Sequence, residues 1–293
     1  MSITAEHLTH IYSKGQPHEH TALDDISFTL KDGTFAGVIG HTGSGKSTLV
    51  QHLNGLLKPT SGRILIGDTD ITAAGTSLLK IRRKTGLVFQ YPEYQLFEET
   101  VYKDVAFGLK MMNVPQEEHD VRIREAIRSV GLDEDILNAS PFDLSGGQKR
   151  RAAMAGVLVM RPEVLVLDEP ASGLDPVGRA EMFRIINDLK KAGTTIVLVT
   201  HNMDEAALYA DRICCVRDGS VLAVATPEEL FADQSRCKEL GIDIPVAASF
   251  ANNVRRRIIS ETGTINLDEI RYDPEEEAAL LYQAVSRHIG GVS

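Results

Sequence analysis

Short apolar runs separated by polar or glycine-containing breaks dominate the first third of the chain. We predict strands at residues 3–12, 22–29, 34–39 and 62–66, because each run is brief and bounded by turn-forming residues. The pair Gly67-Asp68 follows the last of these runs and is typical of a hairpin turn. The first third is therefore predicted to be β structure joined by turns.

A different pattern begins near Gly86. The runs at 87–89, 164–168 and 195–200 are short, and polar, Pro or Gly residues bound each of them. Continuous apolar runs of this length are typical of strands that are buried on both faces of a parallel sheet. Helical patterns lie between the runs, and residues from about 100 to 160 are mostly helical. This order predicts an α/β core with an inserted helical lobe.

Composition and charge exclude several classes of protein. Of 293 residues, 43% are hydrophobic and 25% are charged, a globular balance that argues against wholesale disorder. The formal net charge of −10 is a poor match to a general nucleic-acid coat, so we expect no nucleic-acid partner. No apolar run reaches the ~18 residues of a membrane span, and the first residues lack a signal-peptide pattern. We therefore expect a cytosolic protein that contacts a membrane only through partners.

One motif predicts a phosphate-binding loop. Residues 40–47 match G-x-x-x-x-G-K-[ST], between an apolar strand pattern and a helical pattern. Glycines let successive backbone N–H groups point at phosphate oxygens, and the helix N-terminus adds partial positive charge. Lys46 can reach the outer phosphates, and the Ser47 hydroxyl can coordinate Mg²⁺. We therefore expect a nucleoside triphosphate to bind at Gly40, His41, Thr42, Gly43, Ser44, Gly45, Lys46, Ser47 and Thr48.

Two acids at the end of a predicted strand narrow the chemistry. The run 164–168 ends in Asp168, and Glu169 follows it. Asp168 can hold Mg²⁺ through its hydration shell, and Glu169 can polarise the attacking water. Hydrolysis of this kind depends on positioning and charge stabilisation, so a metal ion, a lysine and one water-orienting carboxylate suffice. Such a pair can also be ordinary solvated acid, but the P-loop favours hydrolysis.

The sequence LSGGQ at residues 144–148 precedes another helical run. Taken alone, this turn is a helix N-terminus with exposed amides, which is a second anion site. Together with the P-loop, it makes the chain resemble the ATP-binding cassette (ABC) ATPases. The resemblance implies that the turn of one subunit closes on the γ-phosphate held by the P-loop of another, so that the active site exists only in a dimer. The residues of this turn that would contact the nucleotide are Ser145, Gly146, Gly147 and Gln148.

The resemblance assigns roles to further residues. Tyr12 is placed like the aromatic residue that stacks on adenine, although a Tyr at a strand end also has a purely structural explanation. Gln90 matches the glutamine that contacts Mg²⁺ and the attacking water. Asp175 matches the aspartate that contacts the partner subunit beside the nucleotide, and His201 matches the histidine on the γ-phosphate. The resemblance thus implies a catalytic set of Lys46, Gln90, Glu169 and His201, and Mg²⁺ contacts from Ser47, Gln90 and Asp168.

The resemblance becomes closer at residues 89–101, FQYPEYQLFEETV, which KDVAFG follows. This segment looks like the ATPase subunits of energy-coupling factor (ECF) transporters, and it is most similar to the second of their two ATPase subunits. That family imports vitamins or transition-metal ions: two ATPases drive a transmembrane T component, and an S component captures the substrate. The resemblance implies a peripheral protein at the cytoplasmic face of the membrane. It would contact a second ATPase subunit, identical or different, and the T component, and the S component only indirectly.

The resemblance also sets the expected architecture. It implies a P-loop NTPase with a RecA-like parallel core, an N-terminal antiparallel β subdomain, an α-helical subdomain at about 91–160 and a small C-terminal helical extension. We expect the ATPase domain at 1–245 and a dimerisation segment at 246–293. Asp273, Pro274 and the glutamates at 275–277 give the start signal of a helix. Its apolar face would consist of Leu280, Leu281, Ala284 and Val285.

Alternatives stay open beside this interpretation. The apolar residues Tyr91, Tyr94, Leu96 and Phe97 are candidates for a groove that receives a T-component helix, or for the local core of the lobe. The chain could instead serve a conventional ABC importer, which co-purification would distinguish. A soluble ABC protein of translation or DNA repair fits less well, because the former usually carries two cassettes and the latter a long coiled coil. A non-enzymatic, ATP-gated module predicts a damaged catalytic set, yet the set is complete.

Overall fold

The structure, a computed structural model, describes residues 1–232, 234–250, 253, 272–273 and 275–280. An antiparallel sheet of order β2-β1-β4-β5 forms the N-terminal part. Its strands are β1 (Ile3–Tyr12), β2 (His20–Leu30), β4 (Ser61–Ile66) and β5 (Thr69–Asp70). The second sheet has the order β10-β9-β3-β8-β7-β6 and is parallel except for β10. Its strands are β3 (Phe35–Ile39), β6 (Thr85–Val88), β7 (Val164–Asp168), β8 (Thr195–Val199), β9 (Arg212–Arg217) and β10 (Ser220–Ala225).

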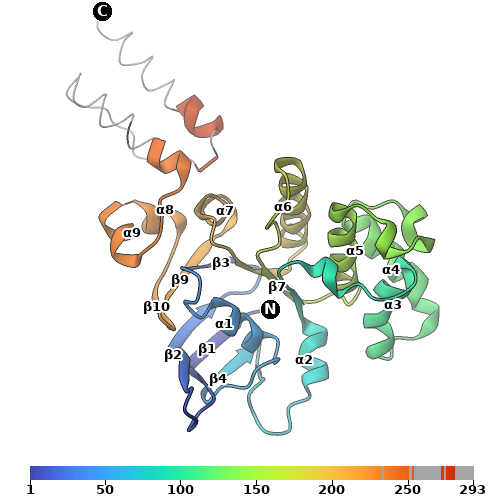
Figure 1. The fold of residues 1–293 in the computed structure, drawn as a ribbon, viewed down its shortest axis with the longest axis horizontal. Coiled ribbons are helices and arrows are strands. Elements are labelled where there is room, and N and C mark those ends of the chain that lie inside the picture. Colours follow the sequence, from blue (N-terminus) through green and yellow to red (C-terminus); the bar gives the residue numbers. More distant parts are fainter. Residues whose placement is uncertain (233, 251–252, 254–271, 274, 281–293) are drawn as a thin grey trace, which may run out of the picture.

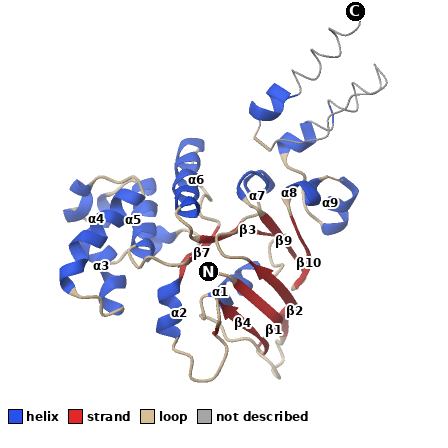
Figure 2. Ribbon diagram, turned by 180° about the vertical axis from the view of Figure 1, so that it is seen from behind, coloured by secondary structure: helices blue, strands red, loops and turns tan. Residues whose placement is uncertain are grey.

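Helices cover both faces of the second sheet (Figure 1 and Figure 2). The α-helices are α1 (Lys46–Leu53), α2 (Leu78–Lys84), α3 (Val101–Met111), α4 (His119–Ser129), α5 (Gly146–Leu158), α6 (Pro176–Lys191), α7 (Met203–Tyr209), α8 (Pro227–Phe231) and α9 (Gln234–Leu240). Short 3-10 helices are η1 (Pro92–Gln95), η2 (Gln116–Glu118), η3 (Glu134–Asn138) and η4 (Pro141–Asp143). Helix α1 lies between the two sheets, α6 and α7 lie on the opposite face, and α3, α4 and α5 form a lobe at one side.

Two hydrophobic cores explain why the central strands are apolar at every position. In β3, Phe35 and Ile39 pack into the core on the side of α6 and α7, whereas Ala36 and Val38 pack into the core shared with α1 and the first sheet. Because successive side chains of a strand point to opposite faces, a strand covered on both faces loses the polar alternation of a half-exposed strand. The continuous runs in the sequence therefore reflect a sheet enclosed by two layers.

The predicted α/β fold with an antiparallel N-terminal sheet and a helical lobe is confirmed. The predicted strands 3–12 and 164–168 have the bounds of β1 and β7, while the predicted strand 87–89 is displaced because β6 begins at Thr85. Strands β9 and β10 have no counterpart among the predicted strands. No helix in the described ranges is long and apolar enough to span a bilayer.

The limits of the predicted domains remain predictions. Within the predicted C-terminal helix, residues 275–280 are helical. The carboxylate Oδ1 of Asp273 accepts hydrogen bonds from the backbone N–H groups of Glu275 and Glu276, at 2.9 and 3.0 Å, as expected for an N-cap. Pro274, Leu281, Ala284 and Val285 lie outside the described residues.

Candidate active site

The loop between β3 and α1 is shaped by glycines that contact the neighbouring backbone. Gly45, the N-cap of α1, has φ 103°. A Cβ atom on Gly45 would lie 2.5 Å from the carbonyl oxygen of Ala22, and one on Gly40 would lie 2.0 Å from that of Val216. Neither distance is possible without moving backbone, so both positions require glycine. The loop is therefore fixed against β2 and β9, with the start of α1 directed toward the cavity described below.

Lys46 lies inside this loop. Its Nζ atom donates hydrogen bonds to the carbonyl oxygens of Gly40 and His41, at 2.8 and 2.9 Å. Burial lowers the pKa of Lys46, and the nearby carboxylates of Glu169 and Asp168 act in the opposite direction. The ammonium group is thus held at the inner side of the loop, where it can attract phosphate oxygens.

Polar residues converge at the carboxyl ends of three parallel strands. Gln90 follows β6, Glu169 follows β7 and His201 follows β8. The Gln90 side-chain amide donates to Oε2 of Glu169 at 2.9 Å, and Nδ1 of His201 lies 2.7 Å from Oε1 of Glu169. Carboxyl ends of parallel strands are where open α/β sheets bind their ligands. Three of the four residues predicted for catalysis, Gln90, Glu169 and His201, therefore form one hydrogen-bonded group.

Asp168 and Glu169 are held in place in different ways. Burial raises the pKa of Asp168, while hydrogen bonding from Ser47 and the charge of Lys46 lower it. Glu169 has the left-handed backbone angle φ 49°, and its N–H donates to the carbonyl of Val199 at 2.9 Å. Left-handed backbone at a residue other than glycine is unfavourable and persists where the surroundings hold it, often at functional sites.

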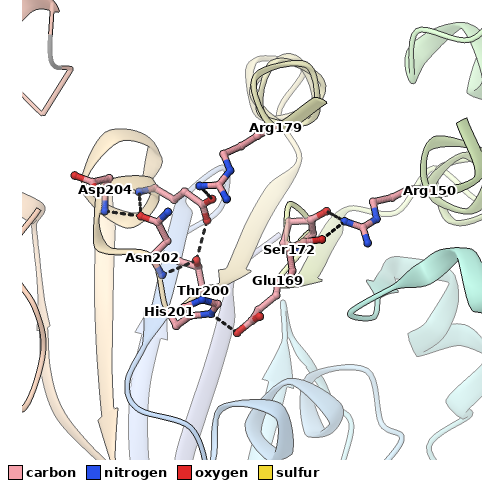
Figure 3. Close-up of polar contacts among 10 residues, drawn as sticks. Arg150, Glu169, Ser172, Arg179, Thr200, His201, Asn202 and Asp204 are labelled. Atoms are coloured by element: carbon pink, nitrogen blue, oxygen red, sulfur yellow. Dashed lines mark hydrogen bonds and ion pairs between the residues drawn. The ribbon is translucent and has the colours of Figure 1, made fainter. Parts of the chain in front are cut away.

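A second network lies behind His201 (Figure 3). The Thr200 hydroxyl donates to Oε2 of Glu205 at 2.8 Å, and the backbone N–H of Asn202 donates to that hydroxyl at 3.0 Å. Nη1 of Arg179, on α6, lies 3.4 Å from Oε1 of Glu205. Burial raises the pKa of Glu205, and the Thr200 hydrogen bond and the Arg179 charge oppose this rise. The turn that carries His201 is therefore held on both sides.

The P-loop and the polar residues that follow β6, β7 and β8 line one cavity of about 480 Å³. The site residues predicted from the sequence that line this cavity are Tyr12, Thr42, Gly43, Gly45, Lys46, Ser47, Thr48, Gln90, Asp168, Glu169 and His201. Gly40, His41 and Ser44 belong to the same loop but do not line the cavity. The ring of His41 turns away instead, with Nε2 3.5 Å from Oδ1 of Asp218.

Tyr12 stands at the edge of the cavity. Its hydroxyl oxygen is 3.3 Å from the Thr48 hydroxyl, and its ring makes an edge contact with the ring of His10, with centroids 4.5 Å apart. Tyr12 lines the cavity and is 39% exposed, so a planar base in the cavity could contact its ring. The predicted role in adenine stacking remains a prediction.

Five further predicted nucleotide contacts, outside the P-loop, do not line this cavity. Ser145 begins α5 with a capping box, in which its hydroxyl accepts from the N–H of Gln148 at 3.3 Å and the Gln148 side chain accepts from the Ser145 N–H at 3.0 Å. Asp175 caps α6 and accepts from the N–H of Gly178 at 2.7 Å. The residues placed away from the cavity are Ser145, Gly146, Gly147, Gln148 and Asp175.

Sequence reasoning missed some residues of the site. His20 and Ala22 line the cavity from the start of β2, and no local pattern marks them, because only the packing of the two sheets brings them there. Arg150 is also unpredicted. It is buried between the segments that follow Gln90 and Glu169 and is described below.

The residues present suit Mg²⁺. Asp168 is a half-buried carboxylate whose pKa burial raises, so a nearby cation would favour its ionised form, and Ser47 lies beside it. Among the described residues, no group of three or more His, Cys, Asp or Glu side chains is arranged so that it could hold a metal ion by itself. Mg²⁺ needs none, since in nucleotide sites it takes one or two carboxylates, phosphate oxygens and water.

A glycine-rich phosphate loop, an Asp-Glu pair and a histidine at the edge of a parallel sheet define a P-loop nucleoside triphosphatase. The model of the ABC transporter family matches residues 23–172. The chain belongs to this family and is one of its ATPases.

Its relatives and structural neighbours agree with this assignment. The chain is 52% identical over 260 residues to the energy-coupling factor transporter ATP-binding protein EcfA2 of Clostridioides difficile strain 630, covering 88% of this chain and 90% of that protein. The protein of the same name from Symbiobacterium thermophilum is 49% identical, with 88% and 89% covered. The structure of cbiO1 from Clostridium perfringens, part of the ABC transporter complex cbiONQ, is 38% identical with TM-score 0.72, covering 85% of this chain and 98% of that one. The dimeric cassette MJ0796, bound to ADP and phosphate, is 30% identical with TM-score 0.69, covering 77% and 98%.

Proposed function

We propose that this chain is one of two ATPase subunits of an ECF-type importer, and that ATP is hydrolysed at sites shared between the two subunits. One observation carries the proposal. The P-loop, Asp168, Glu169 and His201 line one cavity, whereas the intact LSGGQ turn of the same chain lies elsewhere. A second subunit, which is either another copy or a different ATPase, would supply the missing turn. A structural neighbour that is described as dimeric supports this arrangement.

The LSGGQ turn, residues 144–148, is suited to such a contact. Ser145 and Gly146 are exposed, and α5 begins with backbone N–H groups at its free end. The N-terminus of a helix attracts anions through these N–H groups and through its dipole. Each ATP would then contribute binding energy to both subunits, which links the nucleotide state to the geometry of the pair.

Within one site, we assign the roles as follows. Lys46 and the loop amides bind the β- and γ-phosphates, and Ser47, Asp168 and Gln90 would hold Mg²⁺, which neutralises charge on the phosphates. Glu169 orients the attacking water and accepts its proton, and His201 positions Glu169 through their 2.7 Å contact. The loop donors are in place before the reaction, so little reorganisation is needed.

A groove beside the segment that follows Gln90 is the proposed docking site for the T component. It has a volume of about 380 Å³. Apolar side chains border most of it; they come from α2, α3, α5, the 95–97 segment and the residues just after α1 and α5, and include Leu56, Leu79, Phe97, Phe107, Met111 and Met160. Phe97 and Phe107 are exposed and make an edge contact, with ring centroids 5.1 Å apart. Exposed apolar patches of this kind mark interaction sites, and a groove suits an amphipathic helix.

Two of the four groove candidates from the sequence line this groove. Phe97 is exposed within it, and Leu96 lines it while remaining 9% exposed, so Leu96 also belongs to the lobe core. Tyr91 and Tyr94 do not line it. Tyr94, within η1, is 85% exposed.

The docking test compares two equally exposed apolar residues of the same lobe. Phe97→Asp places a charge in the groove, and Val121→Asp places one on α4 outside it; the two parent side chains are 58% and 57% exposed. We expect Phe97→Asp to abolish co-purification with the membrane components and Val121→Asp to preserve it. Equal recovery of the complex with both variants would refute the groove assignment.

The same experiment identifies the transporter. Recovery with a T component, an S component and a second ATPase supports the ECF assignment, with vitamins or transition-metal ions as proposed substrates. Recovery with a permease and a separate binding protein would instead make the chain the ATPase of a conventional ABC importer. In either case, we place the chain at the cytoplasmic face of the membrane, where it is held by these partners.

A further inference from the structure

A buried arginine joins three segments that surround the catalytic group. Arg150 lies on the second turn of α5 and is 3% exposed. Its guanidinium contacts η1 on one side. On the other side it contacts the loop after Glu169 (Figure 3). Buried guanidinium groups need several partners, because the charge and the N–H donors lose their water.

The contact with η1 is a two-point ion pair. Nε of Arg150 donates to Oε2 of Glu93 at 3.0 Å, and Nη2 donates to Oε1 at 2.8 Å. Burial alone would raise the pKa of Glu93, but the hydrogen bonds and charge of Arg150 outweigh burial, and the pKa lies below its ordinary value. Glu93 is three residues after Gln90, whose amide donates to Glu169. The ion pair therefore fixes the segment that carries Gln90.

The contact with the other segment uses two backbone carbonyls. Nη1 of Arg150 donates to the oxygens of Pro170 and Ser172, at 3.3 and 2.5 Å. The N–H of Ser172 in turn donates to the carbonyl of Glu169 at 3.1 Å. The turn that begins at the catalytic glutamate is therefore closed on one side by the arginine.

Both held segments contain an unfavourable backbone angle. Tyr91, next to Gln90, has φ 56°, and Glu169 has φ 49°. The Tyr91 ring also lies under the guanidinium, with its centroid 5.6 Å from Cζ of Arg150. Left-handed backbone at residues other than glycine is unfavourable and persists only where surrounding contacts hold it. Arg150 supplies such contacts to both segments at once.

We propose that Arg150 is a positioning residue for hydrolysis: it sets Gln90 and Glu169 relative to each other and ties their placement to helix α5. Helix α5 begins at the LSGGQ turn, which would contact the nucleotide bound by the partner subunit. A movement of that turn would therefore be transmitted through Arg150 to Gln90 and Glu169 of this subunit. This second step rests on the proposed shared site. The first step requires only the ATPase activity of the chain.

Lysine cannot replace arginine in this arrangement. Arg150 uses its planar fork for two bonds to Glu93 and two to carbonyls in a fixed geometry, whereas an ammonium is a point charge on a flexible stem. Arg150→Lys keeps the positive charge beside Glu93, so it tests geometry rather than charge.

The neighbouring arginine provides a matched control. Arg151 lies on the same helix and pairs with Glu181 of α6, away from η1 and from the loop after Glu169. Arg151→Lys is the same chemical change one residue away. ATP hydrolysis, ATP affinity and melting temperature are measured for the full-length parent and both variants, in the ATPase assembly in which the parent hydrolyses ATP.

We expect Arg150→Lys to lower kcat by about 100-fold, the effect of a misplacement of roughly 1 Å in a catalytic group. The KM for ATP should stay within about twofold, because none of the P-loop residues contacts Arg150. Arg151→Lys should keep the parent kcat. A kcat for Arg150→Lys equal to that of Arg151→Lys would overturn the proposal, and so would a parallel loss of kcat and ATP affinity.

A second variant separates positioning from folding. Glu93→Gln leaves Arg150 in place and removes the charge of its partner. If the two residues act as one unit, the double variant Arg150→Lys/Glu93→Gln should lose no more kcat than Arg150→Lys alone. Losses that multiply would overturn the proposal. These results do not depend on whether the T component docks in the groove. If the proposed shared site is wrong, the parent protein will hydrolyse ATP without subunit pairing, which is a separate readout.

Discussion

Replacing Glu169 by glutamine tests the assignment of the water-orienting carboxylate. The substitution keeps the shape of the side chain. Its amide oxygen can accept from Gln90 as Oε2 does now, and its amide nitrogen can donate to Nδ1 of His201 when that nitrogen is unprotonated. The change thus removes charge and basicity and leaves packing in place. We expect kcat to fall about 10²–10⁴-fold, the usual contribution of a positioned general base. This fall equals about 3–5 kcal/mol in the activation barrier.

The assay pairs steady-state ATP hydrolysis with ATP binding at equilibrium. Affinity should be retained, because the Lys46 contacts to the loop carbonyls do not involve Glu169. Glu163→Gln serves as the control, since Glu163 comes directly before β7, at the end of that strand opposite the cavity. Its exposed carboxylate lies 3.8 Å from Nζ of Lys84. Hydrolysis by Glu169→Gln at the parent rate would refute the role given to Glu169.

Three further predictions concern binding and stability. Lys46→Ala should weaken ATP binding at least tenfold by calorimetry, because the loop loses its buried cation; unchanged affinity would contradict this. Gly40→Ala should destabilise the fold by about 3 kcal/mol in urea unfolding, because its Cβ would lie 2.0 Å from the Val216 oxygen, whereas Gly156→Ala meets nothing within 4 Å and should not destabilise it. Burial lowers the pKa of His52 from 6.5, so below that pH the unfolded chain binds the proton first and stability should fall, by at most about 1.4 kcal/mol per pH unit. Comparing unfolding at pH 7 and at about pH 5.5 should show a smaller loss for His52→Gln than for the parent; equal losses would contradict the pKa direction.

The fold could be predicted well where a local pattern reflects the local environment. Residues 164–167 are apolar on both faces because two layers enclose β7, so pattern and structure agree. Strand β10 gave no such signal. Its exposed and half-buried positions follow from pairing with β9 at the edge of the sheet, and edge position is a tertiary property. The bounds of β6 shifted because its first residue, Thr85, is a buried polar residue within the sheet.

The site could be predicted where a motif is contiguous. The P-loop and the Asp-Glu pair are each one short segment. They come together because they follow parallel strands whose carboxyl ends lie side by side. Arg150 could not be found in this way. Its partners Glu93 and Ser172 are 57 and 22 residues away in the chain, so only the packing of α5 against two loops reveals its role.

The account depends most on the claim that one subunit holds only half of each active site. ATP hydrolysis per subunit, measured over a wide range of concentrations for this chain alone and with the second ATPase of its transporter, tests that claim directly, with light scattering on the same samples. In at least one of these two samples, we predict a pair of subunits that forms only with ATP. On dilution, ATP hydrolysis should be lost at the same concentrations at which this pair dissociates. Full turnover by a dilute monomer that never pairs in the presence of ATP would contradict the account.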